Sequence, residues 1–206
     1  MRTTLSSPPS RDFPAMPGIE DEDVHLVALA KGDPRAFAPL YRRYFDPVYR
    51  YCYRRLGSPE AAADATAHVF AKALAALPRY REESSSFRSW LFTIAHNVIV
   101  DDLRSRRPTS SLETAAHVAA RDPSPEDVAL SEEAGRTVRA LLAALPPDQR
   151  QILELRLAGL TGPEIAAVLG RTLGAVKIAQ VRAFARLRAT FDPSGARSME
   201  VASDES

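Results

Sequence analysis

The chain lacks several features that would assign it to a well-marked protein class. It has one cysteine, Cys52, among 206 residues, which excludes an intramolecular disulfide and a zinc site built from several cysteines. We interpret Cys52 as a buried, inert thiol rather than a redox sensor. No apolar run approaches the ~20 residues that span a bilayer, and no apolar run follows Arg2 as it would in a signal peptide. We therefore expect a cytoplasmic protein with no membrane segment of its own.

Signals for strands and for catalysis are also missing. No alternating apolar and polar run is flanked by the Asn-Gly or Asp-Gly turns of hairpins, and aromatic residues are only 7% of the chain. The histidines are scattered, and no nucleophile–base motif or cluster of metal ligands is present. The phosphate-binding pattern G-x-x-x-x-G-K-[ST] is absent as well. We expect an all-α protein that is not an enzyme and that uses no cofactor or metal.

Helical periodicity fills two blocks, 23–104 and 126–191, and is absent elsewhere. The segment 1–22 is rich in serine, proline and arginine towards its start and is predicted to be a disordered extension. The segment 105–125 contains three prolines and few large apolar residues, which is typical of a flexible linker. The polar segment 192–206 is predicted to be a disordered tail. The predicted fold is thus two small helical domains joined by a flexible linker.

The second block ends in the pattern of a helix-turn-helix. Residues 161–188 read TGPEIAAVLGRTLGAVKIAQVRAFARLR, and Thr161 with Glu164 forms a capping box at the start of a short helix. Gly170 stands where a tight turn requires a positive φ, and Thr172 is placed to cap a second helix. This order of cap, turn and cap predicts a motif whose second helix enters the major groove of DNA.

The second helix of this motif has two distinct faces. Val176, Ala183 and Leu187 are seven and four residues apart and are predicted to face inward. The residues predicted to face outward and to contact bases or phosphates are Lys177, Ile178, Val181 and Arg182. Residues 171–191 hold five basic side chains, starting at Arg171, and no acidic one. A merely solvated basic face is the alternative, but the coincidence of caps, turn and core stripe favours DNA binding.

A helix over residues 87–100, FRSWLFTIAHNVIV, combines three kinds of surface. Two apolar strips, around Leu91 and around Ile99, are predicted to pack against other helices. The remaining arc is polar but uncharged; it holds Ser89, Thr93, His96 and Asn97, has Trp90 at its edge, and is flanked by arginines that include Arg88 and Arg104. The arc can be a solvent-exposed face or a surface that binds nucleic-acid bases. The residues alone do not favour either interpretation over the other.

The two blocks together resemble an extracytoplasmic-function (ECF) sigma factor, the class of the sigma superfamily that has only regions 2 and 4. The segments that carry the resemblance are LVALAKGDPRAFAPLYRRYFDPVYRY, DATAHVFAKAL, FRSWLFTIAHNVIVDDLRSRR, LPPDQRQILELRLAGLTGPEIAAVLG and GAVKIAQVRAFARLR. The resemblance implies that residues 23–104 are region 2, which binds core RNA polymerase and the −10 element. It implies that residues 126–191 are region 4, which binds the −35 element.

The resemblance also implies roles for particular residues and partners. Core polymerase would contact the helix containing Asp64, Phe70 and Lys72, and Asn97 falls where such sigma factors contact a flipped −10 base. The full set implied for the −10 element is Arg88, Trp90, Thr93, His96, Asn97 and Arg104, and that for the −35 element is Arg171, Lys177, Ile178, Val181 and Arg182. Promoter DNA, core polymerase and an anti-sigma protein are the implied partners.

Two places depart from the family pattern, and two other functions compete with it. Ala67 and His68 stand where many members have Gln-Glu, and Ala179 and Gln180 where many have Arg and Leu. A stand-alone helix-turn-helix regulator is the main alternative, but it does not explain the segment rich in aromatics and arginines at 79–107. A protein that occupies polymerase without using DNA is the other alternative.

Overall fold

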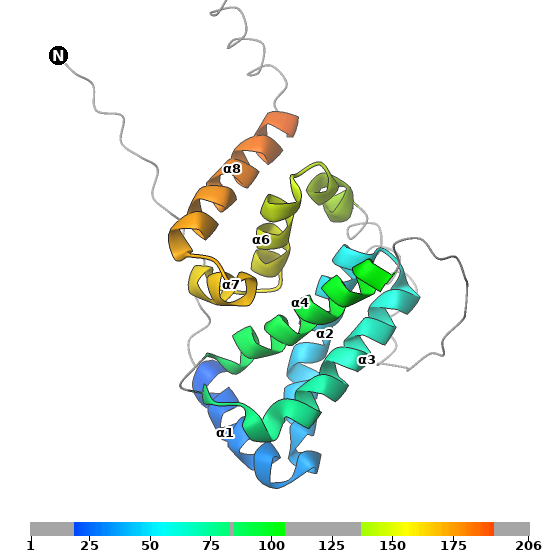
Figure 1. The fold of residues 1–206 in the computed structure, drawn as a ribbon, viewed down its shortest axis with the longest axis vertical. Coiled ribbons are helices and arrows are strands. Elements are labelled where there is room, and N and C mark those ends of the chain that lie inside the picture. Colours follow the sequence, from blue (N-terminus) through cyan, green and yellow to red (C-terminus); the bar gives the residue numbers. More distant parts are fainter. Residues whose placement is uncertain (1–18, 83–84, 106–136, 192–206) are drawn as a thin grey trace, which may run out of the picture.

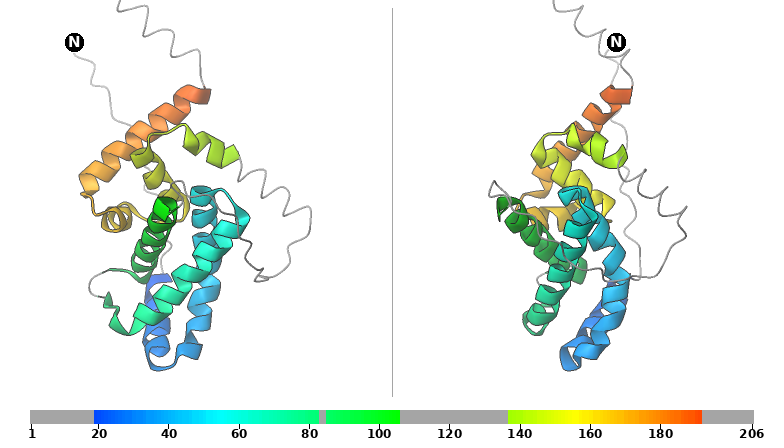
Figure 2. Two further views of the ribbon diagram at one scale, coloured as in Figure 1. Left: turned by 45° about the vertical axis from the view of Figure 1, so that its right-hand side comes forward. Right: turned by 90° about the vertical axis from the view of Figure 1, so that its right-hand side faces the viewer.

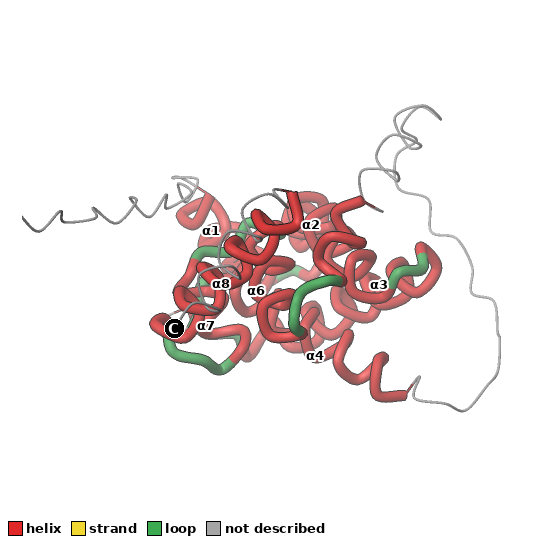
Figure 3. Tube along the Cα trace, turned by 90° about the horizontal axis from the view of Figure 1, so that it is seen from above, coloured by secondary structure: helices red, strands yellow, loops and turns green. Residues whose placement is uncertain are grey.

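The computed structural model describes residues 19–82, 85–105 and 137–191, and within these ranges every regular element is helical (Figures 1 and 3). This confirms the all-α prediction. The α-helices and 3₁₀ helices are α1 (Ile19–Gly32), η1 (Pro34–Phe37), α2 (Ala38–Leu56), α3 (Pro59–Ala76), η2 (Leu77–Arg79), α4 (Phe87–Ser105), α6 (Pro147–Leu157), α7 (Gly162–Leu169) and α8 (Leu173–Phe191). A further helical segment covers residues 137–143.

The ends of the helices follow the capping signals in the sequence. Gly57 ends α2 in the left-handed conformation at φ 79°, which costs glycine little because it has no Cβ. The side chain of Ser58 then accepts a hydrogen bond from Ala61 N at 3.2 Å, and Pro59 takes the first turn of α3. Helix α1 begins at Ile19, four residues before the predicted start of the first block. The disorder and the flexible linker predicted for residues 1–18, 106–136 and 192–206 concern segments that lie outside the described residues.

The first block is built on α2, α3 and α4, with α1 packed alongside (Figure 1). Both apolar strips predicted for α4 are buried over most of their length, since Leu91, Phe92 and Ile99 have no exposed surface. The same apolar cluster includes Leu40 and Tyr51 of α2, which are also fully buried. Cys52 is buried in the same core, as predicted, and burial raises the pKa of its thiol to about 11. The thiol therefore stays protonated and unreactive near neutral pH.

The second block contains the predicted helix-turn-helix, formed by α7 and α8. Thr161 Oγ1 accepts a hydrogen bond from Glu164 N at 3.4 Å, and the Glu164 carboxylate accepts one from Thr161 N at 2.8 Å. Gly170 has φ 61° in the turn, and Thr172 Oγ1 accepts from Ala175 N at 3.2 Å to cap α8. The predicted capping box, left-handed glycine and second cap are all confirmed.

The two blocks are in direct contact, which the sequence did not predict. Helix α4 packs against α7, and α2 packs against α6 (Figures 1 and 2). Buried apolar residues of both blocks, such as Ile99 and Ile165, form one continuous cluster. A smaller cluster within the second block joins Leu142, Leu145, Leu153 and Ala183. The helix-turn-helix is therefore docked on the first block rather than held apart from it.

The left-handed turn gives a stability prediction with a matched control. A Cβ added at Gly170 would meet nothing within 4 Å, so Gly170→Ala tests backbone conformation alone and should destabilise the protein by ~1 kcal/mol. Gly174 also has open space around it but sits in α8 without a positive φ, so Gly174→Ala should stabilise by roughly 0.5 kcal/mol. Urea unfolding followed by circular dichroism measures both; equal effects of the same sign would contradict the assignment.

Candidate nucleic-acid interface

Helix α8 presents the predicted recognition surface to solvent. Val176 and Ala183 have no exposed surface and fix the helix against α6 and α7. This anchoring turns the opposite face outward, where Ile178 is 56% and Val181 69% exposed. Lys177 and Arg182 are exposed on the same helix. An exposed pair of large apolar residues between two cations is unusual on a plain solvent face and suits contact with DNA bases and phosphates.

Three further residues of this region are engaged within the second block. Arg171 forms an ion pair with Asp148 of α6 at 2.9 Å, so its guanidinium is partly neutralised. Gln180 accepts a hydrogen bond from Arg156 at 3.2 Å, and Ala179 packs against the core. Ala179 and Gln180, the two residues of α8 that differ from the family pattern, thus take part in packing and in an internal hydrogen bond.

The polar arc of α4 is only partly exposed. Asn97 is exposed, as is Arg104, but Ser89 is 2% exposed although it lies on the arc expected to face outward. Helix α7 packs against α4 in this arrangement. Thr93 is half-buried and donates its hydroxyl to Ser89 O at 2.9 Å. Of the arc residues, Asn97 is therefore the one best placed to meet a ligand in this arrangement.

The remaining predicted −10 residues of α4 already have partners inside the protein. Arg88 donates to Gly159 O, in the turn between α6 and α7, at 3.0 Å. Trp90 is half-buried, with its ring 4.9 Å from that of Tyr80. The His96 ring lies 3.2 Å, Nδ1 to Oη, from the hydroxyl of Tyr51. Burial raises the pKa of Tyr51, so its hydroxyl keeps its proton.

A cavity of about 220 Å³ lies beside the first turn of α4, and no motif or periodicity in the sequence points to it. Its walls combine aromatic rings with polar groups, namely Asp23, Tyr44, Tyr80, Ser86, Phe87 and Arg88. The buried Asp23 carboxylate accepts hydrogen bonds from Tyr44 and, at 2.5 Å, from Arg43. Four separate elements of the chain meet here, which is why periodicity along one helix could not reveal the cavity.

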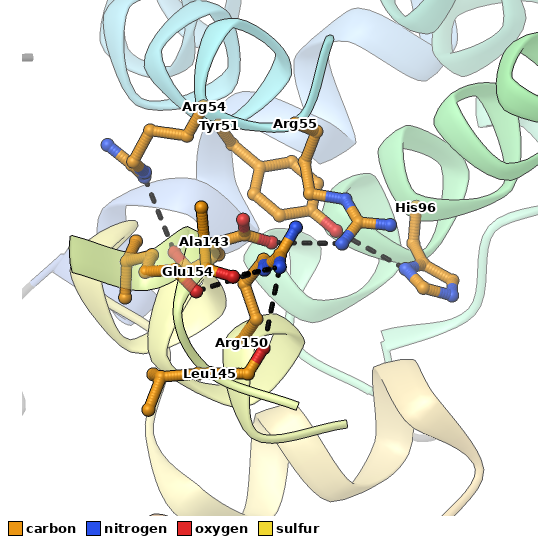
Figure 4. Close-up of polar contacts among 9 residues, drawn as sticks. Tyr51, Arg54, Arg55, His96, Ala143, Leu145, Arg150 and Glu154 are labelled. Atoms are coloured by element: carbon orange, nitrogen blue, oxygen red, sulfur yellow. Dashed lines mark hydrogen bonds and ion pairs between the residues drawn. The ribbon is translucent and has the colours of Figure 1, made fainter. Parts of the chain in front are cut away.

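A buried ionic contact joins the two blocks next to His96 (Figure 4). Glu154 of α6 is 1% exposed and pairs with Arg55 of α2 at 3.1 Å, while Arg54 donates to Glu154 O at 3.3 Å. Burial raises the pKa of the Glu154 carboxyl and the arginines act against this rise. Around the same junction, Arg150 donates to the carbonyls of Leu142 and Ala143 and so closes the bend before α6.

Comparison with known proteins assigns the chain to a family. Residues 40–109 match the Sigma-70 region 2 family and residues 135–187 match Sigma-70 region 4. The ECF RNA polymerase sigma factor BldN of Streptomyces coelicolor is 33% identical over 88% of this chain and 71% of its own length. SigD of Mycobacterium tuberculosis is 34% identical over 81% of this chain and 82% of its own. This chain belongs to the ECF sigma factor family.

A solved structure supports the fold of this ECF sigma factor. CnrH, in complex with the cytosolic domain of CnrY, superposes with a TM-score of 0.64 at 29% identity, covering 83% of this chain and 97% of CnrH. Region 2 contains α2, α3 and α4, and region 4 contains α6, α7 and α8. As an ECF sigma factor, the chain is a transcription initiation factor whose two regions recognise promoters.

Within region 2, some of the predicted polymerase-binding residues of α3 lie on the surface and one lies in the core. Asp64 and Lys72 are exposed, and so are Ala67 and His68, which replace the residues that many ECF sigma factors carry. Phe70 is only 5% exposed and its ring lies 4.7 Å from that of Tyr41. In this conformation Phe70 supports α3 from the core side, and its contact with polymerase stays a prediction. Among the described residues, no group of three or more potential metal ligands is gathered.

The environment of His96 leads to a prediction on pH. Burial lowers the pKa of His96, and the nearby Arg55 acts in the same direction. The His96 ring therefore binds a proton less readily in the folded state than in the unfolded chain. The contribution of neutral His96 to stability is complete above the unfolded pKa of ~6.5 and is lost as the pH falls through the folded pKa. From pH 7.5 to pH 5.5, the free energy of unfolding should fall more for the wild type than for His96→Gln. Urea titrations at both pH values measure this, and identical losses would refute it.

Proposed function

We propose that this ECF sigma factor uses α3 to bind core RNA polymerase, α8 to read the −35 element and α4 to hold the −10 element. The single observation that carries the proposal is the outward face of α8. It is exposed, basic and free of acid, and two fully buried residues, Val176 and Ala183, fix it in place. The proposal assigns the chain no reaction, and it places the protein in the cytoplasm, where RNA polymerase transcribes.

The α8 face supports both modes of DNA recognition. Lys177 and Arg182 carry positive charge that can pair with phosphates or with guanine edges in the major groove. Ile178 and Val181 offer apolar contact for thymine methyl groups. Arg171 is tied to Asp148 at 2.9 Å, but the aspartate side chain is 66% exposed, and exposed ion pairs contribute little. Arg171 can therefore exchange its partner for a phosphate at low cost.

Region 2 has two features that are suited to binding single-stranded DNA. Asn97 is an exposed amide able to pair with a base edge, and the cavity at the first turn of α4 has aromatic walls and polar groups suited to a base that has left the stack. Arg88 lines this cavity and Arg104 lies exposed on the last turn of α4, so both are placed for phosphates. Opening the duplex would draw on this binding energy, because extruding a base costs a few kcal/mol.

The exposed side of α3 is the surface proposed to bind core polymerase. Asp64 and Lys72 lie on it with Ala67 and His68 between them, and Phe70 holds the helix from the core side. The short side chain of Ala67 leaves room between the two opposite charges for a helix of the polymerase to approach. We also propose an anti-sigma protein as a partner, since the similar CnrH was solved together with the cytosolic domain of CnrY.

Substitutions on α8 test the −35 assignment. Lys177→Ala and Arg182→Ala should each lower run-off transcription from a cognate promoter by about tenfold, because one good base contact accounts for ~1–3 kcal/mol. Arg42→Ala, an exposed arginine on α2, is the control and should leave transcription unchanged. Unaltered transcription by both α8 variants would contradict the proposal. Tight binding of the wild type to duplex promoter without core polymerase would instead favour a stand-alone regulator.

Separate substitutions test the two surfaces of region 2. Asn97→Ala should change the base preference at one −10 position in run-off assays while leaving the affinity for core polymerase as it is. The double variant Asp64→Ala and Lys72→Ala should do the reverse, lowering the affinity for core polymerase about tenfold if the pair contributes ~1.4 kcal/mol. Fluorescence anisotropy with labelled sigma factor measures the affinity. An unchanged preference at every −10 position would remove Asn97 from the assignment.

A further inference from the structure

The exposed face of α8 is longer than the part that reading of a promoter would use. A recognition helix contacts base edges mainly with its N-terminal residues. Ile178, Val181 and Phe184 are each three residues apart and form one apolar stripe along α8. Phe184, at the far end of this stripe, is 46% exposed, and Arg188 is exposed one turn beyond it. The C-terminal half of α8 therefore presents apolar and basic surface that base contacts leave without a partner.

The residues that directly follow α8 are complementary to this face in charge. Helix α8 has four basic residues and no acidic one, whereas residues 192–206, here called the acidic segment, have four acidic residues and one basic one. The four acidic residues are Asp192, Glu200, Asp204 and Glu205. Because the acidic segment is joined to the end of α8, its effective concentration at the α8 face is roughly millimolar without any second molecule.

The acidic segment begins with the sequence of a chain reversal. Residues 192–195 read Asp-Pro-Ser-Gly, which places aspartate, proline and glycine at the positions that a type I turn favours. The residue before a proline also disfavours the α conformation, in agreement with the end of α8 at Phe191. The pattern predicts that residues 196–206 run back along α8 instead of continuing its direction.

The length of the acidic segment matches the length of the helix. The 19 residues of α8 extend over about 28 Å at 1.5 Å per residue, and residues 196–206 reach up to ~36 Å when they are extended. At ~3.3 Å per residue, Met199 comes about 13 Å back from the turn, which is level with Val181 and Arg182. Asp204 comes about 30 Å back, level with the start of α8, where carboxylates are favoured by the helix dipole.

We propose that the acidic segment folds back on the outward face of α8 and competes with DNA for that face. Met199 and Val201 lie over the apolar stripe, while the carboxylates that follow them pair with Lys177, Arg182 and the start of the helix. The inference rests on the proposed function, because it assigns the same face to the −35 element.

Such a competitor would act more strongly on non-specific DNA than on a promoter. Non-specific binding depends almost entirely on contacts between cations and phosphates, which are the contacts that the carboxylates of the acidic segment imitate. A promoter adds base contacts that the acidic segment does not offer. The acidic segment would thus raise the selectivity of α8 while lowering its affinity for DNA in general.

The contact itself is measured without DNA. A nitroxide spin label on Ser203→Cys in the full chain should broaden the amide NMR signals of Lys177, Val181 and Phe184, while the buried Cys52 stays unlabelled. Added salt should weaken the broadening, because the screening length falls from ~10 Å at 0.1 M to ~3 Å at 1 M ionic strength. A mixture of spin-labelled chains and separate isotope-labelled chains should show no broadening. Broadening in the mixture would mean that a second copy is the occupant and would overturn the inference.

Competition is measured by fluorescence anisotropy with a short DNA duplex of random sequence. A variant that ends at Phe191 should bind this duplex about tenfold more tightly than the full chain, if the acidic segment occupies the face about nine-tenths of the time. The difference should shrink as the salt concentration rises, because the ion pairs between the acidic segment and α8 are screened.

Two matched double variants of the full chain separate competition from a change in net charge. Glu200→Gln with Asp204→Asn neutralises two carboxylates of the acidic segment and should tighten binding of the duplex about threefold, because it lowers the fraction of covered face. Asp46→Asn with Asp101→Asn neutralises two exposed carboxylates on α2 and α4 and should leave the affinity unchanged. Both pairs change the net charge equally, so only the position of the charge differs.

The outcomes are distinct. Salt-sensitive broadening on α8 together with tighter duplex binding by the variants of the acidic segment would support the inference. An absence of broadening, equal duplex affinities with and without residues 192–206, or equal effects of the two double variants would overturn it. The NMR signal requires neither DNA nor polymerase. A failure of the −35 assignment would therefore show in run-off assays of Lys177→Ala and Arg182→Ala while the broadening was still seen.

Discussion

Burial of α4 on more than one side is the constraint on which the rest of the structure depends. Leu91, Phe92 and Ile99 are fully buried within region 2, while α7 packs against another side of the same helix. A helix covered in this way has little surface left for a ligand. Its exposed remainder is Asn97 and the C-terminal end of the helix, and the packing on its buried sides places it rigidly. Rigid placement is what recognition of a single base requires, because a loosely held amide would lose affinity to conformational entropy.

Signals local to one segment of the sequence were sufficient to predict the helix-turn-helix. The capping box of Thr161 and Glu164, the glycine turn at Gly170 and the cap at Thr172 act within a few residues, so each could be predicted from spacing. The inward and outward faces of α8 followed from the 3.6-residue period in the same way. The end of α2 at Gly57 was equally local, because a left-handed residue stops a helix regardless of its distant neighbours.

Features that depend on distant segments were not predictable. Ser89 is buried although it lies on the polar side of α4, and Phe70 faces the core, where its ring lies against that of Tyr41 of α2. The cavity requires Asp23, Tyr44 and Tyr80 to converge from separate elements. The burial of Glu154 depends on its pairing with Arg55, which lies 99 residues away in the chain.

Arg88 illustrates a consequence for changing promoter preference by design. Its guanidinium bonds to Gly159 O of region 4 and also lines the cavity proposed for a base. A substitution there would change the cavity lining and the bond to region 4 together, so the two could not be varied independently at this position. Asn97 is exposed, and the structure gives it no bond to region 4. Asn97 is therefore the less constrained position to vary, and Arg88 is the more constrained one. This holds both for the design of new promoter preferences and for natural divergence after gene duplication.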